Sequence, residues 1–207
     1  MVETGGREHR VSGAYCEADA QRKIAYTWGD RRSGETRNQL QGQRRMNAIK
    51  QFADVWTREN ATTRRVLQAV PDEQSEFRPS PNTKTARELS FIFSFGQGGI
   101  AAALNNTWQW PPNFPPVPAT WAEVVGAFDA TTAAVKEALS NVSEERLIET
   151  VPFFVGPKQP GDVPVGELIW FMLLDAVHHR GQLSIYLRGM NAKVPSIYGP
   201  TADEPWM

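Results

Sequence analysis

The segment PVGELIWFMLLDAVHHRGQLSIYLRG, residues 164–189, has the features of one continuous helix. Pro164 is a favoured first-turn residue, and Gly189 is a favoured stop at the C-terminal end. The first half contains LIWFMLL (168–174), a run that is apolar on every side of a helix. A helix of this kind is normally surrounded by other elements. We therefore predict that four of its side chains are largely buried: Trp170, Phe171, Leu173 and Leu174.

The chain before this segment carries two further helical patterns. Residues 46–70 place apolar side chains at steps of three and four, and Pro71 ends that pattern. A second helix is predicted over about 85–108, because Thr85 and Glu88 have the spacing of a capping box. The glycines inside this helix lack the GxGxxG spacing of a dinucleotide-binding turn. We interpret them as positions where another part of the chain approaches closely.

Proline-rich and long connections separate the remaining helices. Residues 111–118 (PPNFPPVP) cannot be helical, because proline removes a backbone donor and clashes with the preceding turn. Thr120 and Glu123 repeat the capping-box spacing, which predicts a third helix. The long connection 141–163 follows, and VPFFV within it is expected to be extended. Four helices joined in this way predict an all-α fold, a four-helix bundle with a long crossover connection.

Composition limits the classes of function. The chain has 207 residues, 41% of them hydrophobic, which is enough for a packed core. The formal net charge of −1 gives no basic surface for nucleic acid, so a nucleic-acid partner is not expected. No apolar run approaches the roughly 18 to 20 residues that a membrane span needs. The start has no apolar secretion signal, and the single cysteine, Cys16, excludes an intrachain disulfide. These features predict a cytoplasmic protein without a membrane partner.

Residues 1–45 differ from the rest of the chain. They hold nine Lys and Arg residues against six Asp and Glu residues, with few large apolar side chains and no lasting period. We interpret them as a flexible, mildly basic N-terminal tail, or as a stretch upstream of a natural start at Met46. The bundle domain is then predicted to span residues 46–207.

The histidines outside the tail lie together in DAVHHRGQ, residues 175–182. Asp175 and His179 are four residues apart and share one face of the helix, so they form half of a divalent-metal site. The same two side chains also suit a buried structural pair joined by a hydrogen bond, and the residues alone leave both readings open. Arg180 is expected to pair with a carboxylate such as that of Glu88.

The stretch HHRGQLSIYLRGMNAKVPSIYGPTADE, residues 178–204, resembles the C-terminal part of the DinB/YfiT-like family, in which HHRGQ precedes a YGP-(S/T)-A-D segment. RPSPNTKTARELSFI, residues 78–92, is similar to the start of that family's second helix. The match covers about residues 46–206. The resemblance implies a four-helix bundle, often a homodimer, with a divalent metal such as zinc or nickel held by three histidines. It also implies a small-molecule or thiol substrate and thiol-dependent transfer or isomerisation.

Only one of the three implied ligand positions holds a histidine here. His179 matches, Asp175 stands at the position four residues earlier, and Ile92 stands at the position on the second helix. His178 is a weaker candidate ligand between the two. Two functions therefore remain open: a metal-dependent enzyme with an incomplete ligand set, and a non-catalytic bundle for binding or dimerisation. The sequence identifies no catalytic residue.

Overall fold

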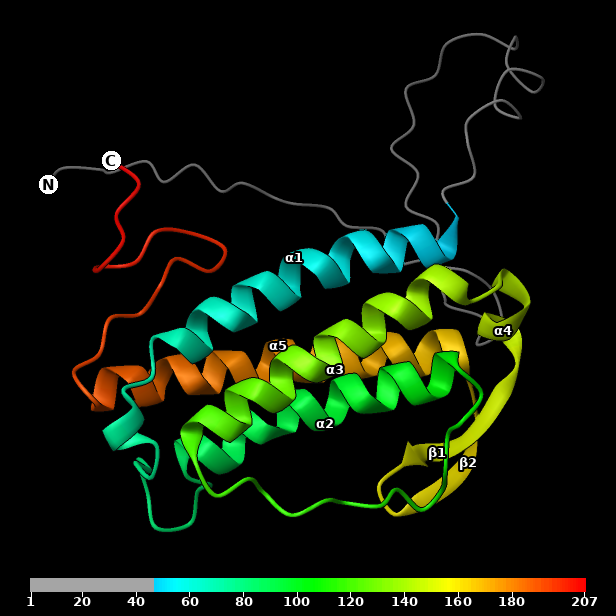
Figure 1. The fold of residues 1–207 in the computed structure, drawn as a ribbon, viewed down its shortest axis with the longest axis horizontal. Coiled ribbons are helices and arrows are strands. Elements are labelled where there is room, and N and C mark those ends of the chain that lie inside the picture. The colour runs from blue at the N-terminus through cyan, green and yellow to red at the C-terminus, as the bar shows by residue number, and fades with distance from the viewer. Residues whose placement is uncertain (1–46) are drawn as a thin grey trace, which may run out of the picture. The chain divides into compact units, whose positions relative to one another are not determined.

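The computed structural model describes residues 47–207, so the predicted tail lies outside the described residues. Four long helices run alongside one another (Figure 1). They are α1 (Ala48–Gln68), α2 (Ala86–Leu104), α3 (Trp121–Asn141) and α5 (Val165–Gly189). The predicted all-α four-helix bundle is thereby confirmed. None of the helices in the described part is both long and apolar enough to cross a membrane.

Capping boxes begin α2 and α3, as the sequence predicts. The Thr85 hydroxyl accepts a hydrogen bond from the Glu88 backbone N–H at 3.1 Å, and the Glu88 carboxylate accepts from the Thr85 N–H at 2.7 Å. Thr120 and Glu123 make the same two contacts at 3.2 and 3.0 Å. Each box satisfies two of the backbone donors that a helix start leaves without partners, which places the first turns of α2 and α3 at these residues.

The second helix ends earlier than predicted. It stops at Leu104, and Trp108 belongs to the connection that follows. Asn106 has a φ of 57°, a left-handed conformation that asparagine tolerates and that turns the chain away from the helix axis. The connection from α2 to α3 is therefore longer than the proline pattern alone indicates.

The long crossover between α3 and α5 contains structure of its own. It holds the short helix α4 (Glu144–Ile148) and a hairpin of two antiparallel strands, β1 (Thr150–Gly156) and β2 (Gln159–Pro164). The extended VPFFV segment is confirmed as the centre of β1. The second strand and α4 were not predicted, because β2 is rich in glycine and proline and α4 has only five residues. The hairpin lies at one end of the bundle (Figure 1).

The run LIWFMLL is less uniformly buried than its composition predicts. Leu173 is buried at 4% exposure, as expected, and Trp170 is half-buried. The prediction is wrong for Phe171 and Leu174, which are 54% and 61% exposed. These two residues are three positions apart and share a helix face. Within residues 47–207, the elements that pack on α5 leave that face partly uncovered.

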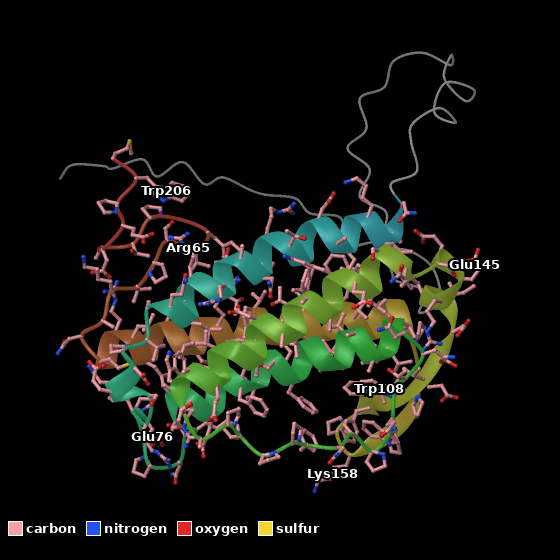
Figure 2. All side chains as sticks on the ribbon, in the orientation of Figure 1. Arg65, Glu76, Trp108, Glu145, Lys158 and Trp206 are labelled. Carbon is pink, nitrogen blue, oxygen red and sulfur yellow. The ribbon has the colours of Figure 1, made fainter. Side chains whose placement is uncertain are left out.

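Irregular chain follows α5, as predicted, and its carboxylates fasten residues 190–207 to the bundle. Asp203 pairs with Arg188 of α5 at 2.5 Å and also accepts a hydrogen bond from the Val194 backbone N–H at 2.9 Å, and the latter bond is the main reason that the pKa of Asp203 lies below the ordinary value. Glu204 pairs with Arg65 of α1 at 2.6 Å; Figure 2 labels Arg65 beside this segment. The YGPTAD motif thus contributes to docking the C-terminal segment.

Candidate functional site

Asp175 and His179 lie one turn apart on α5, as the sequence predicts. His179 Nδ1 is 2.9 Å from the backbone carbonyl oxygen of Asp175 and 3.3 Å from its carboxylate Oδ2. A carbonyl oxygen only accepts, so the hydrogen bond requires the proton on Nδ1. The carboxylate of Asp175 accepts no direct hydrogen bond from residues 47–207, and 41% of the side chain is exposed. The imidazole is therefore hydrogen-bonded to the Asp175 backbone, and its 3.3 Å contact with the carboxylate is an ionic contact without a hydrogen bond.

The two side chains border different hollows of the surface. Asp175 lines a large cavity together with Ile92, whereas His179 lines a separate shallow hollow beside Lys84. His178 is exposed, and its Nε2 lies 3.0 Å from the side-chain nitrogen of Gln182. The three residues proposed as ligands thus do not converge on one point.

The residues present do not fit the three-ligand metal centre that the family resemblance implies. Among the residues that the structure describes, no three His, Cys, Asp or Glu side chains come close enough to hold one ion. Ile92 has a hydrocarbon side chain, and the carboxylate of Glu88 is engaged in the capping box of α2. Asp175 and His179 leave two protein ligands, whereas zinc sites usually have at least three.

Arg180 has a different partner from the one predicted. Its guanidinium is 1% exposed, and Nη2 lies 2.6 Å from the carboxylate of Glu59 on α1. The same nitrogen donates to the Tyr198 hydroxyl at 2.6 Å, and that hydroxyl donates to Glu59 at 2.7 Å. Burial raises the pKa of the Tyr198 phenol, which favours its neutral, donating form. The predicted pairing with Glu88 is wrong, because the capping box engages that carboxylate.

A cavity of about 600 Å³ lies beside α2, between the α2–α3 connection, β1, α3 and α5. We call it the aromatic cavity, because eight aromatic side chains line it. From α2 and the connection come Phe91, Phe95, Trp108, Trp110 and Phe114. From β1 and α5 come Phe153, Phe154 and Phe171.

The α2–α3 connection and the hairpin, which line the aromatic cavity, contact each other. Trp108 Nε1 donates a hydrogen bond to the Pro152 carbonyl of β1 at 3.0 Å, and Figure 2 labels Trp108 beside the hairpin. Trp110 packs edge-on against Phe153 with ring centroids 5.6 Å apart. Phe114 stacks on Phe95 of α2. The hairpin and the α2–α3 connection therefore form one wall facing α2.

Three glycines of α2 also border this cavity. A Cβ at Gly99 would lie 2.9 Å from the sulfur of Met172 on α5, so this glycine allows a close contact between the two helices. At Gly96 and Gly98 a Cβ would meet nothing within 4 Å. The interpretation of the glycines as close-packing positions therefore holds in part at Gly99, where the neighbour is a side chain. The other two instead leave room in the cavity.

A four-helix bundle with an apolar pocket bordered by three of its helices is a helical-bundle scaffold, a class in which ligand sites are commonly built between elements. Residues 39–206 match the DinB family, and the chain belongs to that family.

Three proteins to which the chain is similar differ in the degree of likeness. Uncharacterized protein YrdA of Bacillus subtilis is 25% identical over 153 residues, which cover 74% of this chain and 89% of YrdA. The crystal structure of a DinB-like protein from Bacillus cereus has 22% identity and a TM-score of 0.61, covering 72% of this chain and 97% of that one. A mycothiol-dependent maleylpyruvate isomerase has 14% identity and a TM-score of 0.52, covering 65% and 60% respectively. The two structural likenesses concern the fold alone.

Proposed function

We propose that this chain is a small-molecule-binding member of the DinB family, and that the aromatic cavity holds an apolar ligand with a ring system. The observation that supports this function is the cavity itself. Its volume of about 600 Å³ is in the range of pockets that enclose small molecules. Burial of apolar ligand surface against such walls contributes about 25 cal/mol per Å².

A larger side chain in the wall of the cavity should weaken ligand binding. The variant Gly98→Leu places a branched side chain where a Cβ would meet nothing within 4 Å. The fold should tolerate it, because replacing a glycine inside a helix gains up to about 1 kcal/mol of helix propensity. We expect the wild-type protein to bind the neutral fluorescent probe N-phenyl-1-naphthylamine, and Gly98→Leu to weaken that binding at least about tenfold, equivalent to the loss of roughly 1.4 kcal/mol.

Gly181→Leu is the matched control for this test. Gly181 lies on α5, a Cβ there would also meet nothing within 4 Å, and the residue does not line the aromatic cavity. This variant should bind the probe as the wild-type protein does. Equal binding by Gly98→Leu and the wild-type protein would place the probe elsewhere and contradict the proposed function.

A metal-dependent enzyme of the thiol-transferase or isomerase type is the second candidate. One observation favours it: Asp175 and His179 stay on one face of α5, with His179 Nδ1 3.3 Å from the carboxylate. The arrangement falls one ligand short of a usual zinc site, because Ile92 stands where the family resemblance places a histidine. Weak binding of zinc or nickel that depends on both residues is the most that this donor set supports.

Replacing Ile92 by histidine tests this second candidate. Ile92 and Asp175 line the same cavity, so the new imidazole and the carboxylate would share it. We expect Ile92→His to tighten zinc binding about tenfold or more in calorimetric titration, since a third ligand completes the usual minimum set. Binding should strengthen as the pH rises, because only neutral imidazole binds metal. Ile92→Leu is the control, and no gain from Ile92→His would contradict this second candidate.

A further inference from the structure

We propose that the aromatic cavity selects organic cations: ligands in which a protonated or quaternary amine is attached to an apolar body that carries a ring. This inference rests on the proposed function, since it names the ligand class of the same cavity. Two observations support it: one charged side chain lines the cavity, and aromatic rings lie next to that side chain.

The charge in the cavity is that of a single carboxylate. Among the described residues, Asp175 is the only lining residue with a charged side chain. Its nearest nitrogen partner is His179 Nδ1 at 3.3 Å, and that nitrogen already donates to a backbone carbonyl at 2.9 Å. A carboxylate at an apolar wall attracts a cation more strongly than it would in water, and it repels an anion. No lysine or arginine of residues 47–207 lines the cavity to reverse that preference.

Aromatic rings stand beside this carboxylate. Phe171 lies four residues before Asp175 on α5, so the two side chains are neighbours on one helix face, and both line the cavity. The Phe171 ring packs edge-on against Phe153 at 5.4 Å, and Phe153 packs against Trp110 at 5.6 Å. Ring faces attract cations through their quadrupole, and tryptophan does so most strongly. An ammonium group near Asp175 would therefore lie next to both a carboxylate and the Phe171 ring.

Other classes of occupant fit the same walls less well. A hard metal ion such as calcium takes six to eight oxygen ligands, and one carboxylate with aromatic neighbours supplies too few. An anionic ligand would face Asp175 without a compensating cation among the lining residues. A neutral aromatic ligand gains from the rings and leaves the carboxylate unused. The organic cation is the class that uses both features.

Three ligands that share a phenyl ring on a four-carbon chain and carry a cationic, neutral or anionic head group test the proposal. They are 4-phenylbutylamine, 4-phenylbutan-1-ol and 4-phenylbutyrate, each titrated against the full chain preloaded with N-phenyl-1-naphthylamine. We expect the amine to displace the probe at a concentration about tenfold lower than the alcohol, and the carboxylate to be the weakest of the three. Raising the salt concentration should reduce the preference for the amine, because Asp175 is partly exposed to solvent.

Two isosteric variants assign the preference to one residue. Asp175→Asn should abolish the preference for the amine over the alcohol. Asp54→Asn removes a carboxylate from α1, where it pairs with Lys50, and should keep the preference unchanged. If Asp175→Asn retains the tenfold preference, the charge that selects the amine is not that of Asp175, and the proposal is overturned.

The outcomes separate this inference from the proposed function. Equal displacement by the amine and the alcohol in the wild-type protein would overturn the selection of cations and leave a ligand-binding cavity in place. If neither the probe nor any of the three ligands binds, the proposed function fails and the inference fails with it.

Discussion

Glu59→Ala should lower the free energy of unfolding by about 3 to 5 kcal/mol, the usual cost of removing one partner of a buried ion pair. The guanidinium of Arg180 is 1% exposed and has Glu59 as its carboxylate partner at 2.6 Å. Without that carboxylate, Arg180 keeps its positive charge in a buried place and retains only neutral partners, including Tyr198 at 2.6 Å. The same substitution removes the acceptor that Tyr198 uses to dock the C-terminal segment on α1. Chemical denaturation followed by circular dichroism measures the loss.

Asp129→Ala is the matched control for Glu59→Ala. Asp129 makes two hydrogen bonds with Arg64, at 2.8 and 3.0 Å, but the two side chains are 52% and 30% exposed. Exposed pairs of this kind typically contribute about 0 to 1 kcal/mol, so the control should lose little stability. Replacing both members of the buried pair, as Glu59→Leu with Arg180→Met, should recover part of the loss, because no unpaired charge remains. A loss below about 1 kcal/mol for Glu59→Ala would contradict the assignment of Arg180 as a buried, paired charge.

The helical framework followed from local signals in the sequence. Thr85 and Thr120 begin their helices through contacts with residues three positions later, so a short stretch of chain contains all the information. The end of α2 depends on one left-handed residue, Asn106, which the apolar period does not reveal. The presence and the first turns of these two helices could therefore be predicted, whereas the exact end of α2 could not.

Contacts between helices were harder to predict because they depend on three-dimensional placement. Glu88 and Glu59 are both glutamates of preceding helices, and the apolar period does not say which one faces Arg180. Glu59 faces it because α1 packs along α5, while the capping box engages Glu88. The position of Ile92 beside Asp175 was expected from the family resemblance, and both residues do line one cavity.

The aromatic cavity was not predicted, because segments without a helical period build much of its wall. Trp108, Trp110 and Phe114 lie in a proline-rich connection, and Phe153 lies in the hairpin. The sequence nevertheless held one indication of the cavity. Large aromatic residues are frequent in the proline-rich connection and in the VPFFV segment, and neither segment has a helical pattern that would place these side chains in the core. Aromatic side chains in such connections need a place to pack, and here they pack against one another over α2.

Leu173→Ala should lower the free energy of unfolding by about 2 to 5 kcal/mol, because truncating a buried leucine removes apolar contacts and leaves a cavity. Leu173 is 4% exposed and belongs to the core cluster that includes Phe52 and Leu168. The neighbouring variant Leu174→Ala is its matched control, with the same substitution one residue further along α5. Leu174 is 61% exposed, so its loss should stay within about 0.5 kcal/mol.

The comparison of these two variants also bears on the homodimer that the family resemblance implies, which stays a prediction. Phe171 and Leu174 share an apolar face of α5 that residues 47–207 leave more than half exposed. A second copy packed on that face would make the stability of the wild-type protein depend on its concentration. Denaturation at two protein concentrations therefore distinguishes a homodimer that uses this face from a monomer. A loss for Leu174→Ala that appears only at the higher concentration would place Leu174 between two copies. Equal losses for both variants at low concentration would contradict the orientation of α5 in the bundle.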